Sequence, residues 1–368
     1  MSRLGDLGNR LYRGQLQYDF IARRRRWYAI SGLIVVICAL SLGIRGLNFG
    51  VEFTGGTVFQ VEAQQGTIEQ ARTAMTKAGV NNAVVQRING NKFRIQTEAL
   101  TESERNKAVT SLSKTLSVKE DTVTVQFVGP SWGSEITKKA VTGLVVFLIL
   151  VVIFLSIYFE FKMAMAALVA LIHDVLITVG VYSLLGLEVT PATVIGVLTI
   201  LGYSLYDTVV VFDKVRENTK GLAGSSRMTY SQAANLAVNQ TLVRSINTSV
   251  VALLPVVAIL IGAVGLLGAG TLQELGVALF VGIAAGTYSS IFIATPLLTD
   301  FKEREPAMQA LARRVEQKQA AGPKADKKAK GTAATTPGEP VAAVASAPAQ
   351  AAGKRQQPAR KSRSKKRR

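Results

Sequence analysis

The sequence predicts a polytopic α-helical membrane protein with six transmembrane helices and one α+β domain on the extracytoplasmic side. The 368 residues have a mean hydropathy of +0.27, which is high for a soluble protein, and 48% of them are hydrophobic. The apolar residues are gathered in long runs, and a membrane span needs about 20 such residues. The surplus of positive charge lies at the two ends of the chain, where it predicts cytoplasmic termini.

Six apolar stretches are long enough to cross a bilayer. The first, residues 28–46, follows a run of arginines and is not followed by a cleavage site of small residues. We therefore interpret it as an uncleaved anchor and not as a signal peptide. The region 138–299 holds the other five, at 138–158, 163–186, 192–212, 245–266 and 273–299.

The charges predict the topology. The N-terminal segment, residues 1–27, carries seven Lys or Arg against two Asp, and residues 301–368 carry eighteen against five acidic residues. Positive charge beside a span marks the cytoplasmic side, and an even number of spans agrees with two cytoplasmic ends. Lys138 and Lys139 would lie on the outer side and count against this topology, but the terminal clusters outweigh them.

Residues 300–368 are predicted to form a disordered, basic cytoplasmic tail. They are rich in Ala, Lys and Pro, with almost no large apolar residues after Val315, so they cannot bury enough surface to fold. The final basic run could bind anionic lipid, RNA or ribosomes. The simpler interpretation is a solvated tail that also fixes topology. Removal of everything after Glu305 is expected to leave activity largely intact.

Residues 47–137 predict a small folded domain outside the membrane. The segments "VEFTGGTVFQVEA", "AVVQRINGNKFRIQTE" and "DTVTVQFVGP" have strand character, and Asn89-Gly90 predicts a hairpin turn. Two helices are predicted between them, one capped by Thr67 and stopped by Gly79, the other opened by Thr101. The order β-α-β-β-α-β is that of a ferredoxin-like domain.

This domain is expected to bind or transmit force and not to catalyse a reaction. Its nine basic and nine acidic residues balance, which gives no indication of nucleic-acid binding. It contains neither His nor Cys. The one cysteine of the chain, Cys38, lies in the first span and is interpreted as a packing residue. No metal or cofactor is expected.

Asp207 is the residue that most needs an explanation, because it interrupts the apolar run "LTILGYSLYDTVVVF". A carboxylate inside a bilayer costs about 2.5–3.5 kcal/mol on insertion scales. At helical spacing its face is shared by small and polar side chains, namely Gly196, Thr199, Tyr203 and Ser204. Asp213, six residues later, is interpreted as an interfacial charge that helps to end the span.

Three more ionisable residues lie in apolar surroundings. His173 and Asp174 interrupt the third span, and Arg244 opens the fifth from the same side as Asp207. An ion pair of Asp207 with Arg244 is geometrically allowed and would lower the cost of burial. A static pair holding helices together is one interpretation. The favoured one is an ion or proton pathway through Asp207, Arg244 and Asp174, because intramembrane charges usually mark such pathways.

Five segments resemble the SecF family of bacterial protein-export membrane proteins. They are "VEFTGGT" after the first span, "FVGP" before the second, "ALIHDVLITVG" in the third, "IGVLTILGYSLYDTVVVFDKVREN" in the fourth and "RSINTS" at the start of the fifth. The resemblance covers roughly residues 15–300. Glu52 stands where the family usually has Asp, Tyr206 where Asn is common, and Lys214 where Arg is common.

The resemblance implies half of a transporter of the resistance–nodulation–division superfamily in the bacterial plasma membrane. A SecD-type protein would supply the other half, through an apolar face on spans 4 to 6 that includes Gly282-x-x-x-Gly286. The pair would act with the SecYEG channel and SecA, using the proton motive force to promote translocation of preproteins. Asp207 is then the proton carrier, Arg244 its charge partner, and Asp174 a further relay residue.

The resemblance also implies how the outer domain would act and which functions compete. The domain would move about hinges at Gly55-Gly56 and Gly129-Pro130. A small-molecule or lipid exporter of the same superfamily is the closer alternative, although an outer domain of this size argues against it. An intramembrane aspartyl protease is a remote alternative, because the "LIH" before Asp174 does not match the second motif of such enzymes. We therefore do not expect an enzyme.

Overall fold

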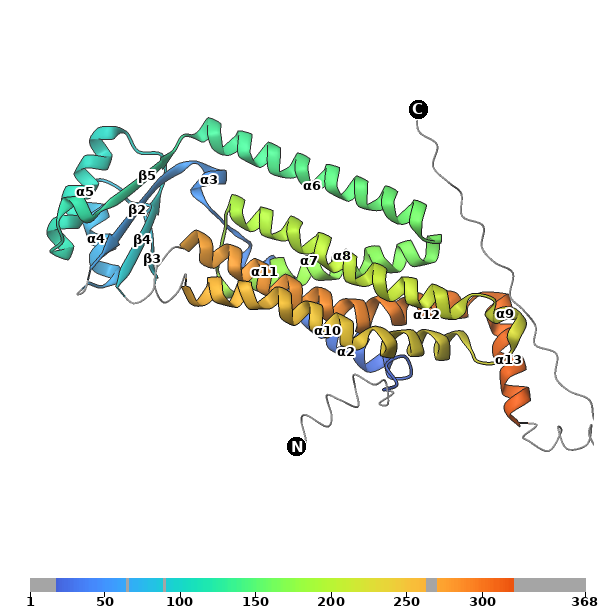
Figure 1. Ribbon diagram of the computed structural model, residues 1–368. Coiled ribbons are helices and arrows are strands. Elements are labelled where there is room, and N and C mark those ends of the chain that lie inside the picture. The colour runs from blue at the N-terminus through green and yellow to red at the C-terminus, as the bar shows by residue number, and fades with distance from the viewer. Residues whose placement is uncertain (1–17, 64–65, 89–90, 263–269, 321–368) are drawn as a thin grey trace, which may run out of the picture. The chain divides into compact units, whose positions relative to one another are not determined.

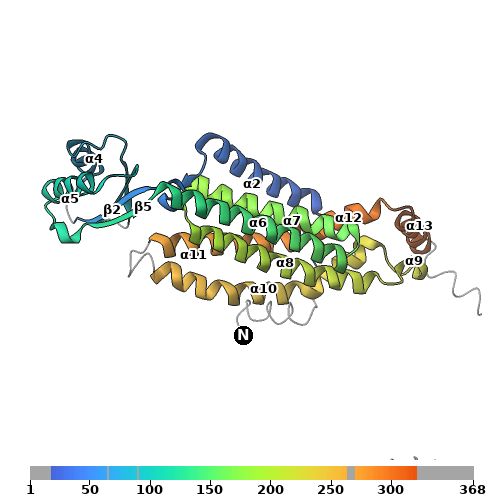
Figure 2. The same ribbon diagram turned by 90° about the horizontal axis from the view of Figure 1, so that it is seen from above.

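The computed structural model describes residues 18–63, 66–88, 91–262 and 270–320. Within these ranges six helices are long and apolar enough to cross a membrane, as the sequence predicts. They are α2 (Arg24–Arg45), α6 (Pro130–Tyr158), α7 (Phe161–Leu185), α8 (Pro191–Thr219), α10 (Tyr230–Gly262) and a last span formed by α11 (Gly270–Ser289), η3 (Ser290–Ala294) and α12 (Thr295–Glu303). Figures 1 and 2 show these helices running alongside one another.

Several helices extend beyond the apolar run that predicts them. Helix α6 begins at Pro130 and not at residue 138, because Gly129 caps it and proline suits the first helical position. Helix α10 begins at Tyr230, well before the predicted start at residue 245. Hydropathy identifies only the part of a helix that suits hydrocarbon, whereas the backbone hydrogen bonding of a helix continues through polar residues.

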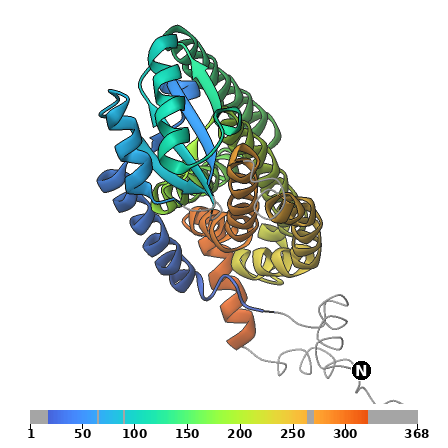
Figure 3. The ribbon, with the colours of Figure 1, turned by 90° about the vertical axis from the view of Figure 1, so that its left-hand side faces the viewer.

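A four-stranded antiparallel sheet with two helices lies between α2 and α6 in the chain. Its elements are β2 (Gly56–Glu62), α4 (Ile68–Lys77), β3 (Val84–Ile88), β4 (Lys92–Thr97), α5 (Glu102–Leu116), the turn η1 (Glu120–Thr122) and β5 (Thr124–Val128). The strands lie in the order β3-β4-β2-β5, and each neighbouring pair is antiparallel. Figure 3 views the chain from the side of this sheet.

One face of the sheet is covered by α4 and α5. The shared core contains Phe59, Val61, Phe93 and Ile95 from the strands and Ala71, Met75, Leu112 and Leu116 from the helices. Thr67 and Thr101 each form a capping box at the start of their helix, which confirms both predicted caps. The hairpin turn predicted at Asn89-Gly90 lies outside the described residues.

The segment that joins α2 to the sheet differs from the prediction. Val51–Thr54 form the short helix α3, so β2 begins only at Gly56. Gly56 has φ +143°, and a side chain there would meet the backbone oxygen of Thr97. Just before α3, β1 (Asn48–Phe49) pairs in parallel with β6 (Glu188–Val189), which joins α7 to α8. This pairing connects the entrance of the sheet domain to the helix bundle.

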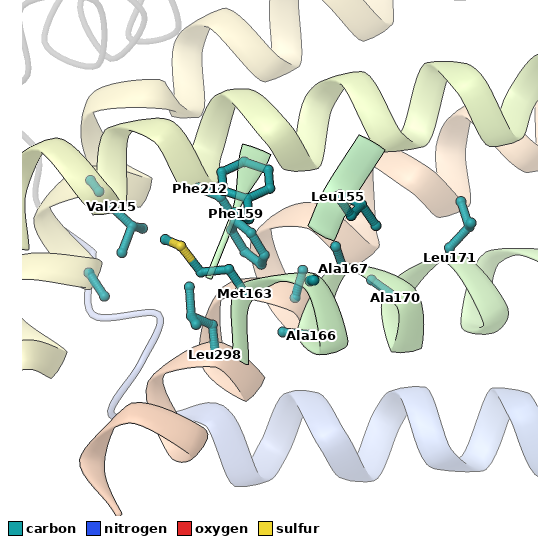
Figure 4. Close-up of a cluster of buried hydrophobic side chains, with 14 of the residues drawn as sticks. Leu155, Phe159, Met163, Ala166, Ala167, Ala170, Leu171, Phe212, Val215 and Leu298 are labelled. Carbon is teal, nitrogen blue, oxygen red and sulfur yellow. The ribbon is translucent and has the colours of Figure 1, made fainter. Parts of the chain in front are cut away.

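A large apolar core and a close helix contact hold the bundle together. Figure 4 shows the core, in which Leu155, Phe159 and Met163 meet Phe212 and Leu298 from other helices. The close contact joins α8 to α11: side chains added at Gly282 or Gly286 would clash with Ile200 or Ser204. The prediction that these two glycines form a partner-binding face is therefore wrong, because their close approach is used within the chain.

The end of the last span also differs from the prediction of a disordered tail from residue 300. Helix α12 continues to Glu303, and α13 (Pro306–Ala320) follows it. Leu311 and Val315 of α13 are buried against Leu222 of the short helix α9 (Leu222–Ser225) and Ala233 of α10. The segment folds because its few apolar residues recur at helical spacing, although their average density is low. The basic run that follows lies outside the described residues.

Candidate functional site: two buried carboxylates in the helix bundle

Asp207 lies on the inward face of α8 and is only 4% exposed. Its Oδ1 accepts a hydrogen bond of 2.8 Å from Ser245 of α10, and its Oδ2 accepts one of 2.5 Å from Ser290 of η3. Both partners are hydroxyls, which can rotate to donate to a carboxylate or to accept from a carboxylic acid. The surroundings of Asp207 can therefore satisfy either protonation state.

Asp174 forms a second buried carboxylate site on α7, with 2% exposure. Its Oδ2 accepts hydrogen bonds from Ser204 of α8 at 2.5 Å and from Ser289 of α11 at 2.8 Å. Its Oδ1 lies 3.0 Å from Nδ1 of His173. Nε2 of that histidine lies 2.5 Å from the hydroxyl of Ser31 on α2. A continuous polar chain therefore crosses from α2 through α7 to the last span.

The two carboxylate sites meet at one turn of the last span. Ser289 and Ser290 are consecutive, yet the first donates to Asp174 and the second to Asp207. The helix changes to π geometry at Ser290, and such π segments are frequent at functional sites. A single turn of the chain therefore holds both acids, and movement of this turn would change the hydrogen bonds of both carboxylates.

Arg244 does not pair with Asp207. Within the described residues its guanidinium makes no ion pair, and Nη2 donates a 2.7 Å hydrogen bond to the hydroxyl of Tyr206. The side chain is exposed and its charge lies 5.7 Å from the centre of the Tyr206 ring. Successive side chains of a helix differ by about 100°, so Ser245 faces Asp207 while Arg244 turns to the neighbouring residue of α8. The expected pair is therefore corrected to two adjacent contacts.

The tyrosine at position 206 explains where Arg244 goes. The family resemblance identifies this residue as a departure from the commoner Asn. A phenol offers both a hydroxyl acceptor and a ring face to a guanidinium, and each interaction is favourable. In this structure Asp207 therefore has neutral hydrogen-bond donors, and Arg244 has a partner of its own.

The other candidate residues fall in distinct places. Asp213 is exposed, in agreement with an interfacial charge. Gly196 and Ser204 are buried as expected for the polar stripe, but Thr199 is exposed. Gly129 caps α6 with Pro130 at its first helical position. Among the described residues, no three His, Cys, Asp or Glu side chains are grouped so that they could hold a metal ion.

The serines were not identified as site residues by sequence reasoning, apart from Ser204 in the stripe. Ser245, Ser289 and Ser290 look unremarkable in a helix, since a hydroxyl can bond to its own backbone. The available signal is their position: each lies within a predominantly apolar span that packs on a helix carrying an acid. A buried acid requires donors, and these are the small donors that neighbouring spans can offer.

The fold and the site define a multi-pass membrane protein with two buried acids inside its helix bundle. Comparisons with known proteins identify its family. Residues 108–304 match the family described as protein export membrane protein SecD/SecF, C-terminal, and residues 40–67 match the SecD/SecF GG motif. The protein translocase subunit SecF of Streptomyces coelicolor is 49% identical over 99% of this chain and 97% of that relative. SecF of Mycobacterium tuberculosis strain H37Rv is 43% identical over 83% of this chain and 72% of its own length.

The comparison with solved structures agrees. The crystal structure of SecDF from Thermus thermophilus, described as a translocon-associated membrane protein, is 32% identical and superposes with a TM-score of 0.71. It matches 79% of this chain, which spans 39% of the length of that SecDF chain. The chain belongs to the SecF family and is a multi-pass protein of the bacterial membrane.

Proposed function

We propose that the chain is a subunit of the Sec protein translocase that uses proton movement across the membrane to promote protein export. The observation that carries this proposal is the pair of buried acids, Asp207 and Asp174, held by consecutive serines where α11 passes into the π segment. Acids inside a bilayer are costly and mark ion pathways. Relatives of this chain are named protein translocase subunits, so protein export is the process that such a pathway would drive.

Protonation of Asp207 changes what its neighbours must do. The carboxylate accepts from Ser245 and Ser290, whereas the neutral acid donates one hydrogen bond and requires an acceptor in return. A hydroxyl must then rotate or a helix must shift, so proton binding biases the packing of α8, α10 and the last span. One elementary charge that crosses 100 mV releases about 2.3 kcal/mol, which biases an equilibrium nearly fiftyfold.

Arg244 is proposed as the charge partner of Asp207 in another state of the cycle. It is adjacent in sequence to Ser245, which contacts Asp207 in this structure. A rotation of α10 by about 100°, or a smaller one combined with a swing of the long arginine side chain, would exchange the hydroxyl for the guanidinium. Asp174 and His173 would extend the pathway toward α2, because hydrogen-bonded contacts already join them to Ser31.

The topology that fits this function has residues 1–27 and the chain end in the cytoplasm and residues 47–137 outside. The distribution of positive charge supports it. We propose that the outer unit is a ferredoxin-like domain, supported by its β-α-β-β-α-β order and the strand order β3-β4-β2-β5. Gly55-Gly56 and Gly129-Pro130, where the chain enters and leaves it, are the proposed hinges.

The proposed partners follow from the family. A SecD-type protein would complete the complex, since a solved relative is a single SecDF chain of which this chain matches 39%. SecYEG, SecA and the moving preprotein are the further proposed partners. We assign no catalytic reaction: an aspartyl protease needs two carboxylates that share a proton, whereas Asp174 and Asp207 each bond to separate serines. No observation favours a small-molecule or lipid exporter.

The test is an Asp207→Asn variant in vesicles that contain the channel, SecA and the SecD-type partner. Asparagine keeps the size and hydrogen bonding of the side chain but cannot titrate, so folding should be retained and stimulation of export by an imposed proton gradient should be lost. Asp213→Asn is the matched control, because it makes the same change at an exposed site of the same helix. Arg244→Met should also abolish stimulation, with little loss of stability because Arg244 is exposed. Full gradient stimulation in Asp207→Asn would refute the proposal.

A further inference from the structure

A buried arginine on the sheet domain is the starting observation. In β4, Phe93 and Ile95 point into the core under α4 and α5, so the alternating residue Arg94 points to the opposite, open face of the sheet. An arginine on an open face is normally solvated, but Arg94 is only 4% exposed. The residues that bury it come from the helix bundle and its connections.

Arg94 is held by acids from two distant parts of the chain. Its Nη2 lies 2.7 Å from Glu188 on β6, and its Nη1 lies 3.7 Å from Glu274 on α11. Glu52 on α3 is the third acid, and a side chain built at Gly50 would meet carboxylate oxygens of both Glu52 and Glu188. The four residues therefore form one cluster between the sheet domain and the helices, which we call the Arg94 cluster.

The Arg94 cluster has more negative than positive groups. Three carboxyls and one guanidinium meet here. Among the described residues Tyr182 of α7 is a further titratable group beside them, since its hydroxyl donates to the backbone oxygen of Glu274. Within the described residues Oε2 of Glu52, Oε1 of Glu188 and Oε2 of Glu274 are buried without a hydrogen-bond partner. Glu188 and Glu274 are at least nine-tenths buried. Buried anionic oxygens without donors are costly, and a bound proton removes that cost.

We propose that the Arg94 cluster is a second proton-binding site, distinct from Asp207, and that a proton held there keeps the sheet domain docked on the helix bundle. With a proton, one carboxyl is neutral and can donate to a neighbouring carboxylate, while Arg94 balances the remaining charge. Without it, the acids repel one another and separation of the domain allows each to be hydrated. Arg94 is the positioning residue of this site, because among the described residues it carries the compensating charge.

The direction of the pH effect follows from linkage. Burial raises the pKa of the Glu188 carboxyl above its ordinary value, Arg94 lowers it in part, and Glu52 raises it again. A carboxyl whose pKa is higher in the docked than in the released state binds protons preferentially when docked. Docking is therefore favoured as pH falls and lost as pH rises through the raised pKa. The ratio of docked to released molecules changes by up to about tenfold per pH unit for one proton.

The experiment measures docking directly in the full chain in lipid nanodiscs, with the same pH on both faces. Cys38 is replaced by Ala, and spin labels are placed at the exposed positions Asn106 of α5 and Leu185 of α7. The distance distribution should show mainly docked molecules at low pH and a growing released population as pH rises. No proton gradient is present, so failure here leaves the Asp207 proposal untouched, and Asp207→Asn should respond to pH as the unsubstituted chain does.

Substitutions in the cluster decide the cause. Glu188→Gln with Glu274→Gln imitates the protonated state and should keep the domain docked across the pH range. Arg94→Gln should reduce the docked population at neutral and alkaline pH, because the carboxylates that stay charged there lose the compensating charge of the guanidinium. Glu98→Gln and Arg72→Gln are the matched controls, since both residues are exposed on the same domain, and they should change nothing.

Two results would overturn the proposal. One is a distance distribution of the unsubstituted chain that does not change between acid and alkaline pH. The other is a pH response that persists in full after the double glutamine substitution. If Arg94→Gln fails to fold, the double glutamine variant still decides, because amides replace carboxyls there without change of size.

Discussion

The helix α13 offers a sharp test of how the chain ends. Two truncations differ only in this helix: one ends the chain after Ala320 and keeps α13, and the other ends it after Glu305 and removes α13. In the structure Leu311 is fully buried and Val315 is 2% exposed, both in contact with α9 and α10. The longer truncation product should be as stable as the full chain, whereas the shorter one should not.

The size of the effect follows from the buried side chains. Complete burial of a Leu or Val is worth about 1.5–3 kcal/mol, so the two together contribute about 3–6 kcal/mol as an upper estimate. Removal also exposes Leu222, which lies against α13 and is 6% exposed when the helix is present. Leu311→Ala in the full chain isolates one part of this effect and should cost about 2–5 kcal/mol.

The difference in free energy of unfolding between the two truncation products is measured by titrating the purified proteins with denaturant in mild detergent. Export in vesicles is measured on the same samples, and Gln317→Ala, an exposed change on the same helix, is the control. Equal stability of the two truncation products would show that α13 does not contribute to the folded state. It would also restore the expectation that everything after Glu305 is dispensable.

Two further predictions concern the last span. Ser289→Ala and Ser290→Ala each remove a donor from one buried acid, so each should abolish or strongly reduce gradient-stimulated export in vesicles. Ser156→Ala is the control, because its hydroxyl donates to the backbone of Val152 in its own helix, and it should have no effect. Unaltered stimulation in both site variants would contradict the role of the serines. Gly286→Val should lower the free energy of unfolding by about 1–3 kcal/mol through overpacking against α8. Gly202→Ala is the control and should be nearly neutral, because an added side chain there meets nothing within 4 Å. Equal denaturation midpoints for the two variants would count against the close helix contact.

The spans could be predicted because each must satisfy a simple requirement, a run of apolar residues as long as the bilayer is thick. The caps at Thr67 and Thr101 could be predicted because capping is local in sequence. The α13 helix could not be predicted in this way, since Leu311 and Val315 are sparse and their packing partners lie far away in the chain. Local composition alone does not distinguish such a helix from a solvated tail.

In the candidate site too, local sequence identifies the acids but not the residues that contact them. Asp207 and Asp174 were identifiable because a charge in an apolar run is conspicuous. Their actual partners depend on which helices meet and at which rotation, so a plausible pair with Arg244 was predicted in place of a serine contact. Arg94 was hidden for a similar reason, because strand alternation predicts that it leaves the domain core but does not show that another part of the chain covers it.

The adjacency of Ser289 and Ser290 also limits how the two acid sites can evolve. A one-residue insertion or deletion in α11 would turn both hydroxyls by about 100° about the helix axis, so each acid would lose one of its donors at the same time. A substitution that shifts the backbone at one serine also moves the other, so it changes the hydrogen bonds of both acids. The acids are 33 positions apart in the chain, yet each accepts a hydrogen bond from the same short segment of the last span. In a mutational scan, double variants that combine position 289 with 290 should be strongly non-additive.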